Sequence, residues 1–184
     1  MTVGSLYNES FHPMPEDDPI ARLARRIDAA KKAEHSAADA DYVAALRRRG
    51  ACDLHSLCAE FVSSVNNRLS QASVDLAPSM YTPDMFRQPG VNLIRIGAQG
   101  REMQIAFEAT RQLFSTEKFL IPYVLEGEVR TYNQRMLDHF EIRNWALFFC
   151  VEEGNGVWRF FDWRTKRTGP VSAEFLVNLM GRLF

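Results

Sequence analysis

The chain has 184 residues, of which 46% are hydrophobic and 24% are charged, and its formal net charge is -1. These values exclude a wholly disordered or fibrous chain. They also give no global attraction to nucleic acid or anionic lipid, so binding of either would need a local patch.

The three cysteines are too few, and odd in number, for the disulfide framework of a small secreted protein. The N-terminal sequence MTVGSLYNESFHPMPEDD has neither the basic start nor the apolar segment of a secretory signal. The longest strongly apolar run, WALFFCV at 145–151, is too short to span a bilayer. We therefore expect a soluble, cytoplasmic protein with no membrane partner.

The pattern along the chain predicts an irregular N-terminal arm, residues 1–18, followed by one α+β domain, residues 19–184. Within the domain we expect, in order, helices over 19–73, a connector over 74–90, a six-stranded antiparallel meander sheet over 91–163 and a short C-terminal helix over 172–184.

The first helix is expected to begin with Asp18 as its N-cap and Pro19 at its first position. Its apolar positions form one narrow face: Ile20, Leu23, Ala24 and Ile27. A weak break is predicted near residues 36–39, and a second helical stretch is predicted to end at Gly50, where the preceding arginines suit a helix C-terminus. A third helix, over about 53–73, has the clearest periodicity.

Beyond Val91 the apolar residues alternate, and three hairpins are predicted, with turns at 99–100, 126–127 and 155–156. The first hairpin would pair Ile96 with Met103 and Ile94 with Ile105. The third would pair Glu152 with Arg159, Val151 with Phe160 and Cys150 with Phe161. Ser172 is expected to cap the last helix.

This order of helices, meander and terminal helix is similar to that of helix-grip proteins, whose sheet wraps around a helix to form an apolar ligand cavity. The similarity is one of element order, because the family's leading strand is missing and the last helix is short for that role. No site residue is carried over from it.

The stretch GACDLHSLCAEF, residues 50–61, raises the question of a metal site. On a helix Cys52 points roughly 120° away from Cys58, so the two thiols cannot share one tetrahedral ion. His55 and Cys58 could still supply two ligands. We favour Cys58 as a small core residue and expect no metal or other cofactor.

The stretch DHFEIRNW, residues 138–145, is a second candidate. If it is a strand, His139, Glu141 and Arg143 share one face, where the histidine could act as an acid or base oriented by Glu141 or Asp138. The competing interpretation, which we favour, is a charged and solvated sheet face.

A ligand pocket would be supported if other polar residues of the sheet lined that same face. The candidates are Arg95, Gln104, Arg130, Tyr132 and Arg143.

The third candidate is basic. The stretch from Ile20 to Arg49 contains eight basic residues and four acidic ones. This stretch could bind phosphate, but charge on the outer face of a helix is ordinary and nucleic acid is not the partner we favour. The basic residues are Arg22, Arg25, Arg26, Lys31, Lys32, Arg47, Arg48 and Arg49.

None of the common nucleophile, metalloprotease, phosphate-loop or dinucleotide motifs occurs in the sequence. The leading hypothesis is a non-enzymatic binding or regulatory module that takes an unidentified protein partner or small ligand through a sheet-face pocket or the helical arm, which could also form a homodimer. The alternatives are a small hydrolase or isomerase that uses His139, and phosphate or nucleic-acid binding by the arm.

Overall fold

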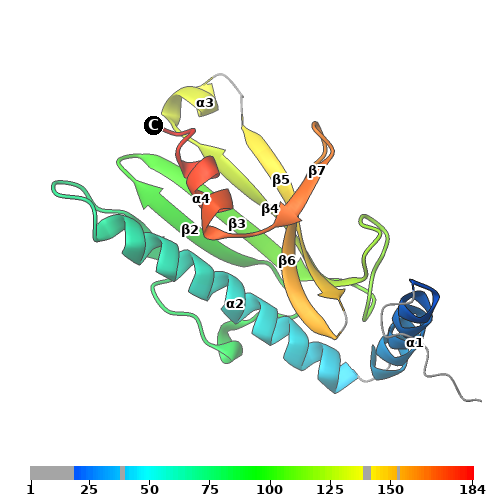
Figure 1. The fold of residues 1–184 in the computed structure, drawn as a ribbon. Helices are drawn as coiled ribbons and strands as arrows, with labels where there is room; N and C mark the ends of the chain where they lie inside the picture. The colour runs from blue at the N-terminus through cyan, green and yellow to red at the C-terminus, as the bar shows by residue number, and fades with distance from the viewer. Residues whose placement is uncertain (1–18, 38–39, 139–141, 153) are drawn as a thin grey trace, which may run out of the picture.

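The computed structural model describes residues 19–37, 40–138, 142–152 and 154–184 (Figure 1). The predicted arm, residues 1–18, and the proposed cap Asp18 lie outside the described residues. So do two positions of the predicted break, 38–39.

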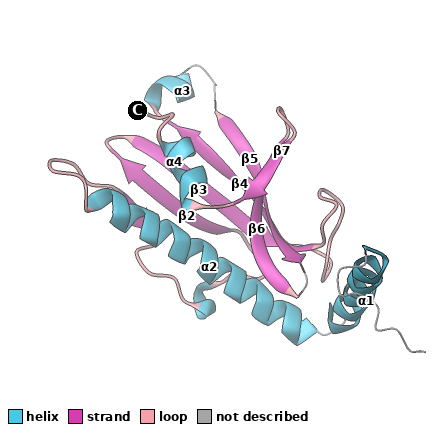
Figure 2. Cartoon of the chain, viewed as in Figure 1, coloured by secondary structure: helices cyan, strands magenta, loops and turns pink. Residues whose placement is uncertain are grey.

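The described elements follow the expected order of helices, antiparallel sheet and short C-terminal helix, which confirms the α+β class (Figure 2). In chain order they are α1 (Pro19–Ala37), α2 (Ala40–Asn66), β1 (Asp75–Ala77), η1 (Pro83–Met85), β2 (Asn92–Ala98), β3 (Arg101–Ala109), β4 (Tyr123–Tyr132), α3 (Gln134–Asp138), β5 (Arg143–Glu152), β6 (Asn155–Asp162), β7 (Arg167–Pro170) and α4 (Ala173–Met180).

The sheet is a meander in which every strand pairs antiparallel with its neighbours in sequence, in the order β1-β2-β3-β4-β5-β6-β7. It has seven strands rather than the six predicted. The two strands predicted for the second hairpin form one strand, β4, while β1 forms within the connector and β7 after the basic turn that follows β6. Helices α2 and α4 contact each other and lie over one face of the sheet (Figure 1). We call this the helix-covered face and the opposite one the open face.

The core lies between α2, α4 and the helix-covered face. Leu54 and Cys58 of α2, Ile94 and Ile96 of β2 and Leu176 of α4 are all fully buried. Burial of such aliphatic side chains stabilises the fold by about 1.5–3 kcal/mol each. In this fold α2, rather than the C-terminal helix, is the long helix that lies across the sheet.

The second helical stretch was predicted to end at Gly50 and a third helix to run over about 53–73, but the two are one helix, α2, which continues through Gly50 and ends at Asn66. The reason is packing. A Cβ atom at Gly50 would lie 2.6 Å from the Phe149 ring, and the Gly50 carbonyl accepts a 2.7 Å hydrogen bond from the Trp158 indole nitrogen. Because this glycine has no side chain, the aromatic side chains of the sheet can pack against the helix. It does not end the helix.

The first hairpin is confirmed residue for residue, since Ile96 pairs with Met103 and Ile94 with Ile105. The second was predicted wrongly, because β4 runs straight through Gly127. At this position a Cβ atom would lie 2.7 Å from the Cβ atom of Phe107 in β3. The glycine allows β3 and β4 to approach each other closely and does not form a turn.

The third hairpin exists, but its turn lies earlier than predicted and its register differs. Glu152 pairs with Asn155, and Cys150 pairs with Val157. Gly154, with a positive φ of 82°, lies in the turn, and a Cβ atom at Gly156 would lie 2.6 Å from Phe149 Cε1. Asn-Gly is thus part of β6, where the glycine makes room for the phenylalanine ring. Ser172 caps α4 as predicted, because its hydroxyl accepts a hydrogen bond from the Phe175 amide.

Candidate functional site

The open face is hollowed at two small side chains, Ala106 and Ala146, which lie on either side of Glu128. Ala106 of β3, Glu128 of β4 and Ala146 of β5 pair directly across the three strands. Because the two alanines barely rise above the sheet, the larger side chains around them enclose a groove of about 610 Å³, which we call the open-face groove. Its walls include Val91, Glu108, Lys118, Glu126, Phe148 and Trp163.

Two glutamates stand side by side in one wall of the open-face groove. Glu108 of β3 pairs directly with Glu126 of β4, an arrangement in which like charges repel. Lys118 lies 3.1 Å from the Glu126 carboxylate, and this ion pair raises the pKa of the lysine. Glu108 is exposed and forms no hydrogen bond or ion pair with any residue that the structure describes. Within the part of the chain that the structure describes, one negative charge of the pair is therefore left without a counter-charge.

The third acidic residue of the groove, Glu128, is held by its neighbours. Its carboxylate pairs with the Arg130 guanidinium and accepts a 3.2 Å hydrogen bond from the Asn144 side chain. Two of the three carboxylates thus have partners on the face, and Glu108 is the charge that remains available to a ligand.

Aromatic residues also line the groove. Phe148 is buried at the base, where Phe119 stacks on it with ring centroids 5.0 Å apart. Trp163, in contrast, is 57% exposed at the rim. The groove therefore combines carboxylates with an accessible indole, and a cation can be attracted to both.

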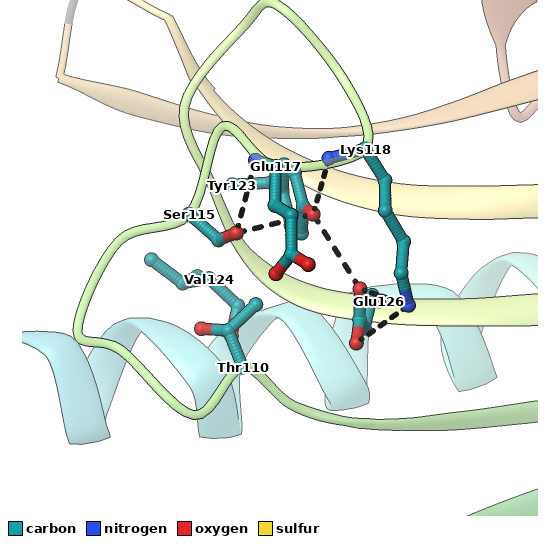
Figure 3. Close-up of polar contacts among 7 residues, drawn as sticks. All are labelled: Thr110, Ser115, Glu117, Lys118, Tyr123, Val124 and Glu126. Carbon is teal, nitrogen blue, oxygen red and sulfur yellow. Dashed lines mark hydrogen bonds and ion pairs between the residues drawn. The ribbon is translucent and has the colours of Figure 1, made fainter.

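The loop over residues 110–122 forms the end of the groove that carries Lys118, and the buried Tyr123 holds it in place (Figure 3). The tyrosine hydroxyl accepts hydrogen bonds from the Lys118 amide, at 3.1 Å, and the Ser115 hydroxyl, at 3.2 Å. It lies 3.5 Å from a Glu126 carboxylate oxygen, to which it can donate. This network fixes the positions of both Lys118 and Glu126.

Arg47 anchors the start of the same loop from α2. Its guanidinium is buried and donates to the carbonyls of Thr110, Gln112, Leu113 and Val124 at 3.4 Å or less, and to the Thr110 hydroxyl. Burial lowers the pKa of this arginine. From the sequence we expected Arg47 to be one of the solvated basic residues of the arm. In the structure it is buried and holds a loop in place.

Four of the predicted ligand-binding residues do lie together on the open face. Arg95, Gln104 and Arg130 pair in one row across β2, β3 and β4. Tyr132 lies beside them, and its hydroxyl donates to Glu102, which also accepts from Gln104 at 2.6 Å. This polar cluster borders the row of Ala106 and Glu128.

Arg143 does not join them. It pairs with Thr131, which is buried, and it therefore belongs to the helix-covered side of β5. Asn144 occupies the place opposite Arg130 on the open face.

The stretch 138–145 is not one strand. Asp138 is the exposed last residue of α3 and accepts a 2.8 Å hydrogen bond from Gln134. His139 and Glu141 lie outside the described residues, and β5 begins only at Arg143. The proposed histidine site thus remains a hypothesis.

His55 and Cys58 both lie on α2 and are buried. The Nε2 atom of His55 lies 2.8 Å from the Pro78 carbonyl, to which it can only donate, so this nitrogen has no lone pair for a metal. Burial raises the pKa of the Cys58 thiol to about 12. Among residues 19–37, 40–138, 142–152 and 154–184 there is no group of three or more His, Cys, Asp or Glu side chains placed to hold a metal ion.

The acidic part of the groove was not predicted from the sequence, because a turn was predicted at 126–127. Once β4 is seen as one strand, alternation puts Glu126, Glu128 and Arg130 on a single face. That signal was present in the sequence, but the pairing of Glu126 with Glu108 depends on the register between β3 and β4.

No family model matches this chain, and no curated protein or solved structure was found to be similar to it. In the part of the chain that the structure describes, no helix has the length and apolar character needed to cross a membrane.

Proposed function

We propose that this protein is a non-enzymatic binding module of the cytoplasm, and that its open-face groove takes a cationic group carried on an apolar or aromatic body. The observation that carries the proposal is the direct pairing of Glu108 with Glu126 in the wall of the groove. A bound cation would lie between two carboxylates that otherwise repel each other.

The electrostatics of the groove support this choice. Its side chains include three carboxylates, of which Glu126 is paired with Lys118 and Glu128 with Arg130, so Glu108 leaves one net negative charge. Charge complementarity of this kind contributes specificity and speeds association more than it contributes affinity. The apolar walls then supply area to bury, and the exposed Trp163 ring can contribute about 0.5–1 kcal/mol by a cation–π contact.

The proposal is tested by titrating the full chain with a short synthetic peptide that alternates arginine and leucine, while tryptophan fluorescence is recorded. Trp145 and Trp158 are each 5% exposed, so the response is expected from Trp163 and should vanish in Trp163→Phe. A saturable change is expected with this peptide. A peptide with glutamate in place of arginine should give none.

The matched pair of variants is Glu108→Lys in the groove and Glu60→Lys on the exposed side of α2. We expect the first to abolish the fluorescence change and the second to leave it intact. Equal responses to the two peptides, or an unaltered response in Glu108→Lys, would show that the carboxylate pair is not the binding feature.

A further inference from the structure

We infer that the occupant of the open-face groove is helix α1 of a second copy of this chain. This inference rests on the proposed function, because it names the cationic, partly apolar partner that the groove was proposed to take. It makes the protein a dimer in which each copy lends its N-terminal helix to the other.

Helix α1 has the composition that the groove requires. Its three large aliphatic side chains are exposed, Ile20 at 74%, Leu23 at 55% and Ile27 at 60%, and they form one ridge at helical spacing. Such apolar ridges at exposed positions mark binding surfaces more often than isolated apolar residues do.

The charge of α1 is complementary to that of the groove. Residues 19–37 contain five basic residues against two acidic ones. Arg26 lies about 90° from the centre of the ridge of Ile20, Leu23 and Ile27 on the helical wheel, so its long side chain can reach a groove wall. One of those walls carries the uncompensated Glu108.

The dimensions also agree. The ridge from Ile20 to Ile27 is about 10 Å long, because a helix rises about 1.5 Å per residue. The row of Ala106, Glu128 and Ala146 crosses three strands, whose outer two lie about 10 Å apart. The ridge can therefore span the groove from Ala106 to Ala146, with Glu128 between them.

A second copy, rather than the same chain, is the source of this helix. Within one chain α1 contacts α2 and lies at its N-terminal end (Figure 1). The groove is on the face of the sheet opposite α2. Reciprocal exchange of the two helices closes a symmetric dimer, the commonest form of homo-oligomer.

The test uses two versions of the full chain, both carrying Cys52→Ser to remove the half-exposed native thiol. One version carries Ala24→Cys on α1, beside the ridge, and the other carries Ala106→Cys in the groove. After the two are mixed and gently oxidised, we expect a disulfide that joins the different chains. Val177→Cys, at an exposed position of α4 on the helix-covered side, replaces Ala106→Cys as the control and should give no such product.

Charge reversal completes the test. Glu108→Lys in the groove chain should reduce the crosslink and weaken the dimer about tenfold in sedimentation experiments, as should Arg26→Glu in the other chain. Combining the two reversals should restore both readings.

Two outcomes would overturn the inference. One is a chain that remains monomeric and gives no crosslink between copies. The other is a single chain carrying both Ala24→Cys and Ala106→Cys that forms only an internal disulfide. If such a monomer still gives the arginine-dependent fluorescence change of Trp163, the proposed function stands without the dimer. If that change is also absent, the proposed function fails as well.

Discussion

The indole nitrogen of Trp158 donates a 2.7 Å hydrogen bond to the carbonyl of Gly50, which joins the middle of α2 to strand β6. The carbonyl belongs to a helical turn, and the side chain that reaches it passes beside Phe149. A glycine in the middle of a helix is usually unfavourable by about 1 kcal/mol relative to alanine. Here the missing side chain is what allows the helix and the sheet to approach.

We predict that Gly50→Ala destabilises the protein, against the normal helix preference. The added Cβ atom would lie 2.6 Å from the Phe149 ring, so the ring or the helix must shift. Overpacking of this kind costs about 1–3 kcal/mol, which outweighs the gain in helix propensity. Urea unfolding should show a net loss of up to about 2 kcal/mol. Ser56→Ala, at an exposed position of α2, is the control and should change little; a more stable Gly50→Ala would refute the packing argument.

A second prediction concerns the buried Arg47. Replacing it with methionine keeps the apolar stem but removes a guanidinium that satisfies four carbonyls and one hydroxyl. The Val124 and Gln112 carbonyls would keep donors from Thr110, but the buried Thr110 carbonyl would lose its Arg47 donor. Since a buried acceptor left without a partner costs about 1–3 kcal/mol, Arg47→Met should lose about that much stability. It should also speed hydrogen exchange in the loop over residues 110–122. The neighbouring Arg48→Met, at an exposed position, should do neither, and similar exchange in both variants would contradict the role assigned to Arg47.

The contrast between the two hairpins shows how far sequence alone reaches. The turn at 99–100 was predicted with its register, because both flanking strands alternate cleanly and no other turn signal competes. The turn at 126–127 was predicted from a glycine that in fact admits β3 at close range. A glycine required by a neighbouring strand and a glycine required by a turn look the same until the neighbour is known.

The candidate site, like the hairpins, could be predicted from the sequence only in part. Arg95, Gln104 and Arg130 share a face as alternation suggested, because a strand's own sequence determines its faces. The pairing of Glu108 with Glu126 and the burial of Arg47 depend on contacts between distant segments. Neither had a local signal in the sequence.

The third prediction concerns the pH dependence of stability and the ion pair between Glu152 and Arg159, near the turn of the β5–β6 hairpin. The hydrogen bond from Arg159 lowers the pKa of the Glu152 carboxyl. The pair therefore contributes stability above the unfolded-state pKa of about 4.3, and this contribution is lost as the pH falls through the lower folded-state pKa. Both side chains remain partly exposed, so the contribution should not exceed about 1 kcal/mol.

The measurement compares urea unfolding of the native chain with that of Glu152→Gln at neutral pH and near pH 3. We expect the native chain to be the more stable at neutral pH and the difference to shrink on acidification. Glu60→Gln, on the exposed side of α2, is the control for carboxylate loss as such. A difference that stays constant with pH would mean that the charge of Glu152 is not what matters.

The last prediction joins stability to the proposed function. Because Glu108 stands directly opposite Glu126, Glu108→Lys should replace repulsion with attraction and stabilise the protein by about 0.2–1 kcal/mol at concentrations too low for the inferred dimer to form. The same substitution on the same face, Glu128→Lys, should destabilise it, because Glu128 already pairs with Arg130 and Asn144. The two variants, compared by thermal unfolding, should thus shift the midpoint in opposite directions. If Glu108→Lys stabilises the fold but abolishes the Trp163 response, Glu108 contributes to binding rather than to stability. If Glu108→Lys instead lowers the stability of the monomer, the two carboxylates do not repel each other in the free protein, and the electrostatic argument for the proposed function fails.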